Sequence, residues 1–179
     1  MSMYLDVTGI AGESISPVTN WAQKIDTNTM GYDVSQKTSL EVGSGLIAGG
    51  AIFGPMQFSK AMDKSTPLLW AKLCGGEPIT TVTIRVSRPG GNPNGPVGGI
   101  FEAEKYILEN VIVTSYHTSG SPGPGGLPME SWSLAFTAIT ECYRTVSATG
   151  NVNPPQTNGW DVTTNLTHTA PNSQMNNPS

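Results

Sequence analysis

The chain has 179 residues, a length typical of one domain with a single hydrophobic core. Only 12% of the residues are charged, about half of the roughly 25% in an average globular protein, and the net charge is −4. The nine basic residues are scattered singly, so no basic patch is present to neutralise a row of phosphates. The longest apolar stretch, 46–53, is far shorter than the roughly 20 residues of a transmembrane helix. We therefore expect neither nucleic-acid binding nor membrane insertion.

The first third of the chain predicts short strands separated by turns. Strands are expected over Met3–Thr8, Ala22–Val34 and Met56–Met62, where apolar and polar residues alternate. Residues 1–9 lack the basic and apolar regions of a secretory signal peptide, so we expect none. The glycine-rich segment 38–54 lacks the features of a phosphate-binding motif and is interpreted as a flexible or interface loop.

One helix is predicted next. Asp63 to Pro67 supply capping oxygens and a proline suited to the first helical turn, and two glycines after Cys74 supply a left-handed stop. Leu69 and Leu73 form an i,i+4 pair, as do Trp70 and Cys74, so the helix is expected to pack on the sheet. Pro67, Leu69 and Leu73 are therefore predicted to be structural residues.

Three long segments predict the rest of the sheet. Residues 79–87 alternate strictly, and residues 104–118 are apolar on both faces, as in a central strand. The glycine-rich segment 89–99 makes them a hairpin. Residues 130–146 alternate through Trp132, a predicted core residue, and change phase at Ile139, which indicates a bulge or a bend onto a second sheet.

The last part of the chain offers little to bury. Residues 150–179 contain seven asparagines and four prolines, a composition unable to build its own core. An exception is a predicted terminal strand near 159–166, in which three apolar residues share one face: Trp160, Val162 and Leu166. We expect a single domain over 1–169 and a disordered tail over 170–179.

The candidates for metal binding and nucleophilic catalysis are few. His117 and His168 cannot by themselves complete a zinc site, and neither lies in an HExxH motif. Cys74 and Cys142 are 68 positions apart; one disulfide between them is conceivable, but a domain of this size does not need it, and two reduced, buried thiols are expected. No GxSxG motif surrounds a serine. We therefore predict no catalytic, cofactor-binding or metal-binding residues.

Two further patterns have simpler structural interpretations. Glu102 and Glu104 would share one face of a strand, about 7 Å apart, but they adjoin a glycine-rich loop and are expected to be a solvated strand end. Trp70 and Trp132 fall at core-like positions, so the tryptophans are interpreted as core residues and not as a sugar-binding platform.

The run Phe58–Leu69 (FSKAMDKSTPLL) resembles the segment that leads into the single helix of the haemolysin-coregulated protein (Hcp) family of bacterial type VI secretion. The resemblance spans nearly the whole chain. Five further segments are similar to family motifs: Gly12-Glu13-Ser14, Val34-Ser35-Gln36, Leu108–Ser115, Glu130–Phe136, and Gly159-Trp160-Asp161 with Asn165.

The resemblance implies a mainly β fold, a β-barrel of two antiparallel sheets flanked by one short helix. It further implies a non-enzymatic subunit that needs no cofactor and forms stacked homohexameric rings, the inner tube of the secretion system. The implied partners are other copies of the chain, the sheath, spike and baseplate proteins, and small effectors carried in the lumen. The implied location is the bacterial cytoplasm before firing and the outside of the cell, or a target cell, afterwards.

The apolar residues of segment 38–54 would promote aggregation if they were exposed on an isolated monomer. We therefore expect four of them to contact a neighbouring subunit or ring: Leu46, Ile47, Ile52 and Phe53. Two other classes of function stay open from the residues alone. One is a non-catalytic tail-tube-like or carbohydrate-binding β-module, and the other is a secreted enzyme or toxin on this scaffold.

Overall fold

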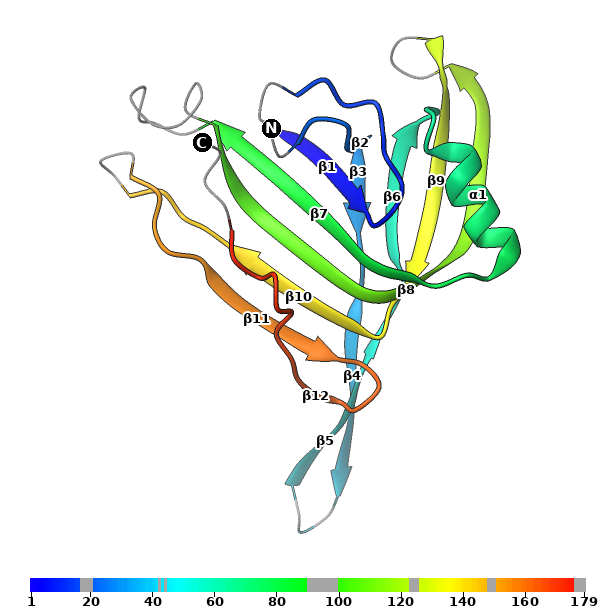
Figure 1. Ribbon diagram of the computed structural model, residues 1–179. Helices are drawn as coiled ribbons and strands as arrows, with labels where there is room; N and C mark the ends of the chain where they lie inside the picture. The colour runs from blue at the N-terminus through cyan, green and yellow to red at the C-terminus, as the bar shows by residue number, and fades with distance from the viewer. Residues whose placement is uncertain are drawn as a thin grey trace.

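The computed structural model describes residues 1–16, 21–41, 43, 45–89, 100–122, 126–147 and 151–175 (Figure 1). The described residues are mostly β, with one short helix that is not long enough to cross a membrane. The elements are β1 (Ser2–Val7), β2 (Ile25–Thr27), β3 (Thr29–Gly31), β4 (Val34–Glu41), β5 (Gly45–Phe53), β6 (Met56–Ala61), α1 (Thr66–Gly75), β7 (Ile79–Pro89), β8 (Ile100–Pro122), β9 (Pro128–Ala135), β10 (Ala138–Tyr143), β11 (Gln156–Asp161) and β12 (Leu166–Thr167).

Strand β8 is the centre of the sheet. Its first half pairs with β7 and β10, its second half pairs with β9, and every strand pair is antiparallel. One branch continues through β7 to β1 and β2, another through β10 to β11 and β12, and the third through β9 to β6 and β3. The predicted hairpin of β7 and β8 is confirmed, with Ile84 opposite Tyr106; its turn, residues 90–99, lies outside the described residues.

The predicted change of phase near Ile139 is confirmed as a bend. Strand β9 ends at Ala135 and pairs with β6, whereas β10 begins at Ala138 and pairs with β11. The two strands therefore belong to different branches of the sheet. The core lies between the branches, where side chains from both sides form one cluster that includes Leu5, Phe58 and Trp132.

Two predictions for the N-terminal third were wrong. Residues 22–34, expected as one strand, form β2 and β3, because the chain crosses at Asn28 from β1 to β6, where the Asn28 amide donates to Ser59 O at 2.8 Å. Segment 38–54, expected as a loop, lies largely in the hairpin of β4 and β5. Gly43 and Gly45 have φ angles of 94° and 78°, so these glycines form the sharp turn of a hairpin.

The helix begins and ends close to the predicted positions. Gly76, with φ 62°, terminates α1. The sequence predicts capping oxygens from Asp63 to Pro67, but the Ser65 hydroxyl at the helix start makes no capping hydrogen bond and donates instead to the Asp63 carboxylate. Leu69 is 1% exposed, whereas Trp70 is 52% exposed, so the predicted burial of Trp70 was wrong. Successive helical residues are about 100° apart, and α1 turns Leu69 toward the sheet.

The C-terminal region also differs from expectation. Residues 159–166 are not one strand, because a turn at Asp161 reverses the chain: Asp161 Oδ1 accepts from the amides of Thr163 and Thr164 at 2.8 and 3.0 Å. Leu166 therefore lies exposed on β12. Residues 170–175, expected to be disordered, lie against the sheet with Ala170 and Met175 buried. The rest of the expected tail, 176–179, lies outside the described residues.

Candidate assembly surface and the clusters that support it

The hairpin of β4 and β5 forms a separate two-stranded sheet that projects from the body of the protein (Figure 1). Leu40 lies opposite Leu46 near its tip, and these side chains are 80% and 72% exposed. In the part of the hairpin that the structure describes, the large aliphatic side chains that are exposed are Val34, Leu40, Leu46, Ile47 and Ile52. Such a concentration of apolar side chains on a projecting element is typical of an interaction surface.

The four residues predicted to contact a neighbouring subunit or ring lie in two different environments. Leu46, Ile47 and Ile52 are exposed on β5. Phe53 instead packs at the edge of the core, with its ring 6.2 Å from that of Phe136 in an edge-on arrangement. Phe53 therefore supports the base of the hairpin, and the other three side chains are accessible.

Sequence reasoning missed Val34 and Leu40. The signal that identifies Leu40 is the register of the hairpin, which places it opposite Leu46. A bulge between Gln36 and Thr38 shifts that register. The local sequence does not reveal the bulge, so it does not reveal the pairing either.

An open groove of about 440 Å³ lies between the base of the hairpin and the strands β10 to β12. Its lining includes the apolar side chains of Phe53, Ile139 and Trp160. Tyr32 donates to Glu141 Oε2 at 3.1 Å within this groove. Burial, reinforced by the Glu141 carboxylate, raises the pKa of Tyr32 to about 12.

Asn165 fixes the hairpin to the main sheet. Its Oδ1 accepts from the Ala51 amide of β5 and from Trp160 Nε1, both at 3.2 Å. A Cβ on Gly159 would lie 2.3 Å from His168 O, so only glycine fits beside β12. The segment from Gly159 to Asn165 therefore acts as a support for the hairpin.

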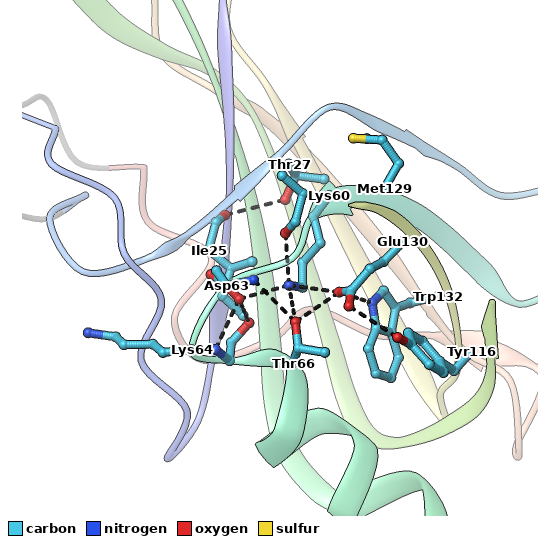
Figure 2. A network of polar contacts seen from close by, with 12 residues as sticks. Ile25, Thr27, Lys60, Asp63, Lys64, Thr66, Tyr116, Met129, Glu130 and Trp132 are labelled. Carbon is cyan, nitrogen blue, oxygen red and sulfur yellow. Dashed lines mark hydrogen bonds and ion pairs between the residues drawn. The ribbon is translucent and has the colours of Figure 1, made fainter. Parts of the chain in front are cut away.

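A buried polar cluster joins the start of α1 to the sheet (Figure 2). The Lys60 side chain is completely buried, and its Nζ lies 3.0 Å from Glu130 Oε2 and 2.7 Å from Asp63 Oδ1. The same ammonium donates to Thr66 Oγ1 at 2.8 Å and to Ala61 O at 3.1 Å. Lys60 is thereby surrounded by acceptors from β6, β9 and the helix start.

The Glu130 carboxylate is equally well satisfied. It accepts from Thr66 Oγ1 at 2.9 Å, from Trp132 Nε1 at 3.2 Å and from the Tyr116 hydroxyl at 3.2 Å. Buried charges are tolerated only when they are paired and hydrogen-bonded in this way. The run Phe58–Leu69 and the segment that begins at Glu130 thus meet in one cluster, to which sequence reasoning had assigned no role.

The two carboxylates considered for acid–base chemistry are both paired with arginines. Glu102 is buried, so the expectation of a solvated strand end was wrong for this residue; its Oε1 lies 2.6 Å from Arg85 Nη1. Glu104 lies 2.6 Å from Arg88. The arginines of β7 reach these carboxylates across the β7–β8 hairpin, and their charges permit the burial of Glu102.

The histidines and cysteines are dispersed. His117 is exposed on β8, and the His168 ring contacts Glu109. Both cysteines are free; Cys142 is buried as expected, but Cys74 is exposed, because it follows Trp70 on the outer side of α1. Among the described residues, no group of three His, Cys, Asp or Glu side chains is arranged to hold a metal ion.

The family model described as "Type VI secretion system effector, Hcp" matches residues 4–143. The chain belongs to the Hcp family. Hcp proteins are secreted, non-catalytic tube proteins of the type VI secretion system, and membership implies assembly into a hexameric tube. A comparison with curated protein sequences found no match.

Solved structures share the fold. One described as a type six secretion system protein superimposes with a TM-score of 0.81 at 22% identity, covering 93% of this chain and 99% of that one. Hcp1 from Salmonella typhimurium has a TM-score of 0.70 at 20% identity, with coverage of 93% and 98%. A type VI secretion system effector from Yersinia pestis has a TM-score of 0.63 at 23% identity, with coverage of 89% and 99%.

Proposed function

We propose that this Hcp protein forms homohexameric rings that stack into the inner tube of the secretion apparatus. In this proposal the contractile sheath expels the tube, and the ring lumen carries small effectors. Sheath, spike and baseplate proteins are the other partners. The protein resides in the bacterial cytoplasm before firing and leaves the cell with the tube.

The observation that carries the proposal is the projecting hairpin of β4 and β5. Its exposed aliphatic side chains contribute no stability to a monomer, because they remain in water. The hairpin also has an exposed strand edge, which is open to pairing with another chain. A contact between the hairpin of one copy and a different surface of the next is heterologous, and such a contact closes into a ring when the rotation permits. We therefore assign Leu46, Ile47 and Ile52 to the contact between copies.

A substitution in the hairpin tests this assignment. Leu46→Asp is expected to leave the fold intact, because the side chain has no contact with the core, and to shift the protein from rings to monomers. Light scattering measures the mass, electron microscopy shows the rings, and circular dichroism checks the fold. Each contact is expected to bury more than about 1,000 Å², so rings of the unmodified chain should persist at micromolar concentration.

Leu68→Asp is the matched control, because Leu68 is also an exposed leucine but lies on α1. Rings that survive Leu46→Asp would contradict the role of the hairpin. So would equal loss of rings in both variants. A chain that stays monomeric without any substitution would contradict ring assembly itself.

A further inference from the structure

Residues 170–175, which we call the strap, lie on the face of the sheet that points away from the core. Tyr106 belongs to the core, and Glu141 lies opposite it on β10. Lys105 and Cys142 are the next residues along these two strands, so they belong to the opposite face. Within the strap the side chains of Ala170 and Met175 are buried, whereas those of Asn172 and Gln174 are exposed. The strap is thus held at its two ends.

The sheet contacts the main chain of the strap. Lys105 Nζ donates to Asn172 O at 2.6 Å and to Gln174 O at 2.8 Å. The Cys142 thiol donates to Ser173 O at 3.3 Å, and the Arg144 guanidinium donates to Met175 O. Every carbonyl from 172 to 175 therefore accepts a hydrogen bond from a side chain of the sheet.

The polar groups that hold the strap are built into the sheet. Lys105, Thr140 and Cys142 are all buried, and Thr140 Oγ1 accepts from the Ala170 amide at 2.9 Å. Burial raises the pKa of the Cys142 thiol, which keeps it protonated and able to donate. Within the described residues, both hydrogen bonds of the Lys105 ammonium go to the strap. These groups need an occupant, since a buried donor without an acceptor is costly.

The strap is not enclosed. An open polar groove of about 500 Å³ runs along it, between Asn172 and Gln174 on one side and Thr83 and Arg85 of β7 on the other. One side of the strap therefore meets solvent. A segment held at its ends and open along one side can leave without disturbing the core beneath it.

We propose that Lys105, Thr140, Cys142 and Arg144 form a docking surface for a short peptide that begins with a turn, as the strap does through its hydrogen bond from the Ser173 amide to Ala170 O at 3.1 Å, and that the strap is the resident occupant of this surface. Main-chain carbonyl and amide groups are common to all peptides, so these four side chains recognise the main chain, and selectivity comes from the two buried side chains of the bound segment. The partner is an uncharged six-residue segment of another protein that can adopt the same turn, with a small first residue and a Met-sized apolar sixth residue. The strap must lift before this partner binds.

Full-length variants with a loosened strap test the proposal. The probe is a fluorescently labelled, end-blocked hexapeptide of residues 170–175. Met175→Asp and Ala170→Asp each place a charge in a buried position, so both are expected to release the strap and to bind the probe at least about tenfold more tightly than the unmodified protein. Gln174→Asp is the matched control: it adds the same charge at an exposed position and is expected to bind as weakly as the unmodified protein.

Substitutions in the probe test main-chain recognition. Alanine at the third and fifth positions is expected to change the affinity by less than about twofold, whereas aspartate at the sixth is expected to lower it by at least about tenfold. In the Met175→Asp protein, Lys105→Met is expected to abolish binding and Lys72→Met to preserve it, because Lys72 lies on α1 and pairs with Glu77.

Three results would overturn the proposal. The first is that both loosened variants bind the probe no better than Gln174→Asp, and the second is that binding survives Lys105→Met. The third is loss of the folded circular-dichroism signal in both loosened variants, which would make the strap an indispensable part of the fold and not a replaceable occupant.

Discussion

The ammonium of Lys60 and the carboxylate of Glu130 lie 3.0 Å apart in the interior, and neither side chain has any exposed surface. Desolvation of two charges costs more than their attraction returns unless further hydrogen bonds satisfy both groups. Asp63 and Thr66 supply these bonds to Lys60, and Trp132 supplies one to Glu130. The pair therefore depends on the start of the helix as much as the helix depends on the pair.

Removal of one charge from this pair is expected to be severely destabilising. Glu130→Gln leaves the Asp63 carboxylate as the counterion of the buried Lys60 ammonium and places a neutral amide beside it, so we expect a loss of about 3 kcal/mol in the free energy of unfolding, the lower end of the range for a broken buried pair. Urea denaturation measures it. The double variant Lys60→Met with Glu130→Leu should lose less stability than the sum of the losses measured for Lys60→Met alone and Glu130→Leu alone. Glu77→Gln, in an exposed pair, should leave the urea midpoint unchanged, and a similar shift in both proteins would contradict the argument.

The helix offers a second comparison. Leu69→Ala removes a fully buried side chain and is expected to cost about 2–5 kcal/mol. Leu73→Ala should cost less, since Leu73 is only partly buried against the core, and Trp70→Ala should cost least because half of its surface already meets solvent. Thermal melting ranks the three proteins. Equal losses at Leu69 and Trp70 would show that the helix packs differently.

Asn165 allows the backbone and the side chain to be tested separately. Its φ angle is 57°, a conformation that glycine adopts freely and alanine does not. Asn165→Gly therefore removes only the amide that bonds Ala51 and Trp160, at about 1 kcal/mol for each bond, whereas Asn165→Ala adds backbone strain. Faster hydrogen exchange at the Ala51 amide is expected in both. Unchanged exchange there would mean that Asn165 does not hold the hairpin.

Alkaline pH is expected to destabilise the protein through Tyr32. Its pKa in the folded protein, about 12, is higher than the ordinary value of 10. The stability contributed by the neutral phenol is complete below pH 10 and is lost as the pH rises from 10 to 12. Burial of Lys105 lowers its pKa and acts in the opposite direction below pH 10.5, so the comparison is made with Tyr32→Phe. Between pH 10 and 12 the Phe variant should lose less stability than the unmodified protein. An equal loss in the two proteins would contradict the raised pKa of Tyr32.

Removal of the strap is expected to weaken the fold. A disordered tail over 170–179 would be dispensable, but a chain that ends after Thr169 loses both carbonyls that accept hydrogen bonds from Lys105. A buried donor left without an acceptor costs about 1–3 kcal/mol, so the urea midpoint should fall while the chain stays folded. An unchanged midpoint would show that water replaces the strap at no cost.

The sequence predicted the elements whose signals are local. The alternation of β7, the apolar run of β8 and the glycine stop of α1 each determine their own structure. The prediction that Trp70 is buried was wrong because two adjacent faces of the helix are apolar, and only packing against the sheet decides which of them is buried. The strap was missed because side chains of the sheet bind it through its own main-chain carbonyls, and such contacts do not depend on which side chains the strap carries. Lys60 and Glu130 lie on strands distant in the sequence, so no local pattern joins them.

The central position of β8 has a consequence for synthesis on the ribosome. The first six strands leave the ribosome before β7, β8 and β9 exist, although β1 pairs with β7 and β6 pairs with β9. During this interval Lys60 has no carboxylate from β9, and the aliphatic hairpin is already present. Pairing over long separations is slow, and unpaired strand edges promote aggregation. The nascent chain is therefore expected to need a chaperone until the residues of β9 have emerged, and to acquire most of its structure in a single late step.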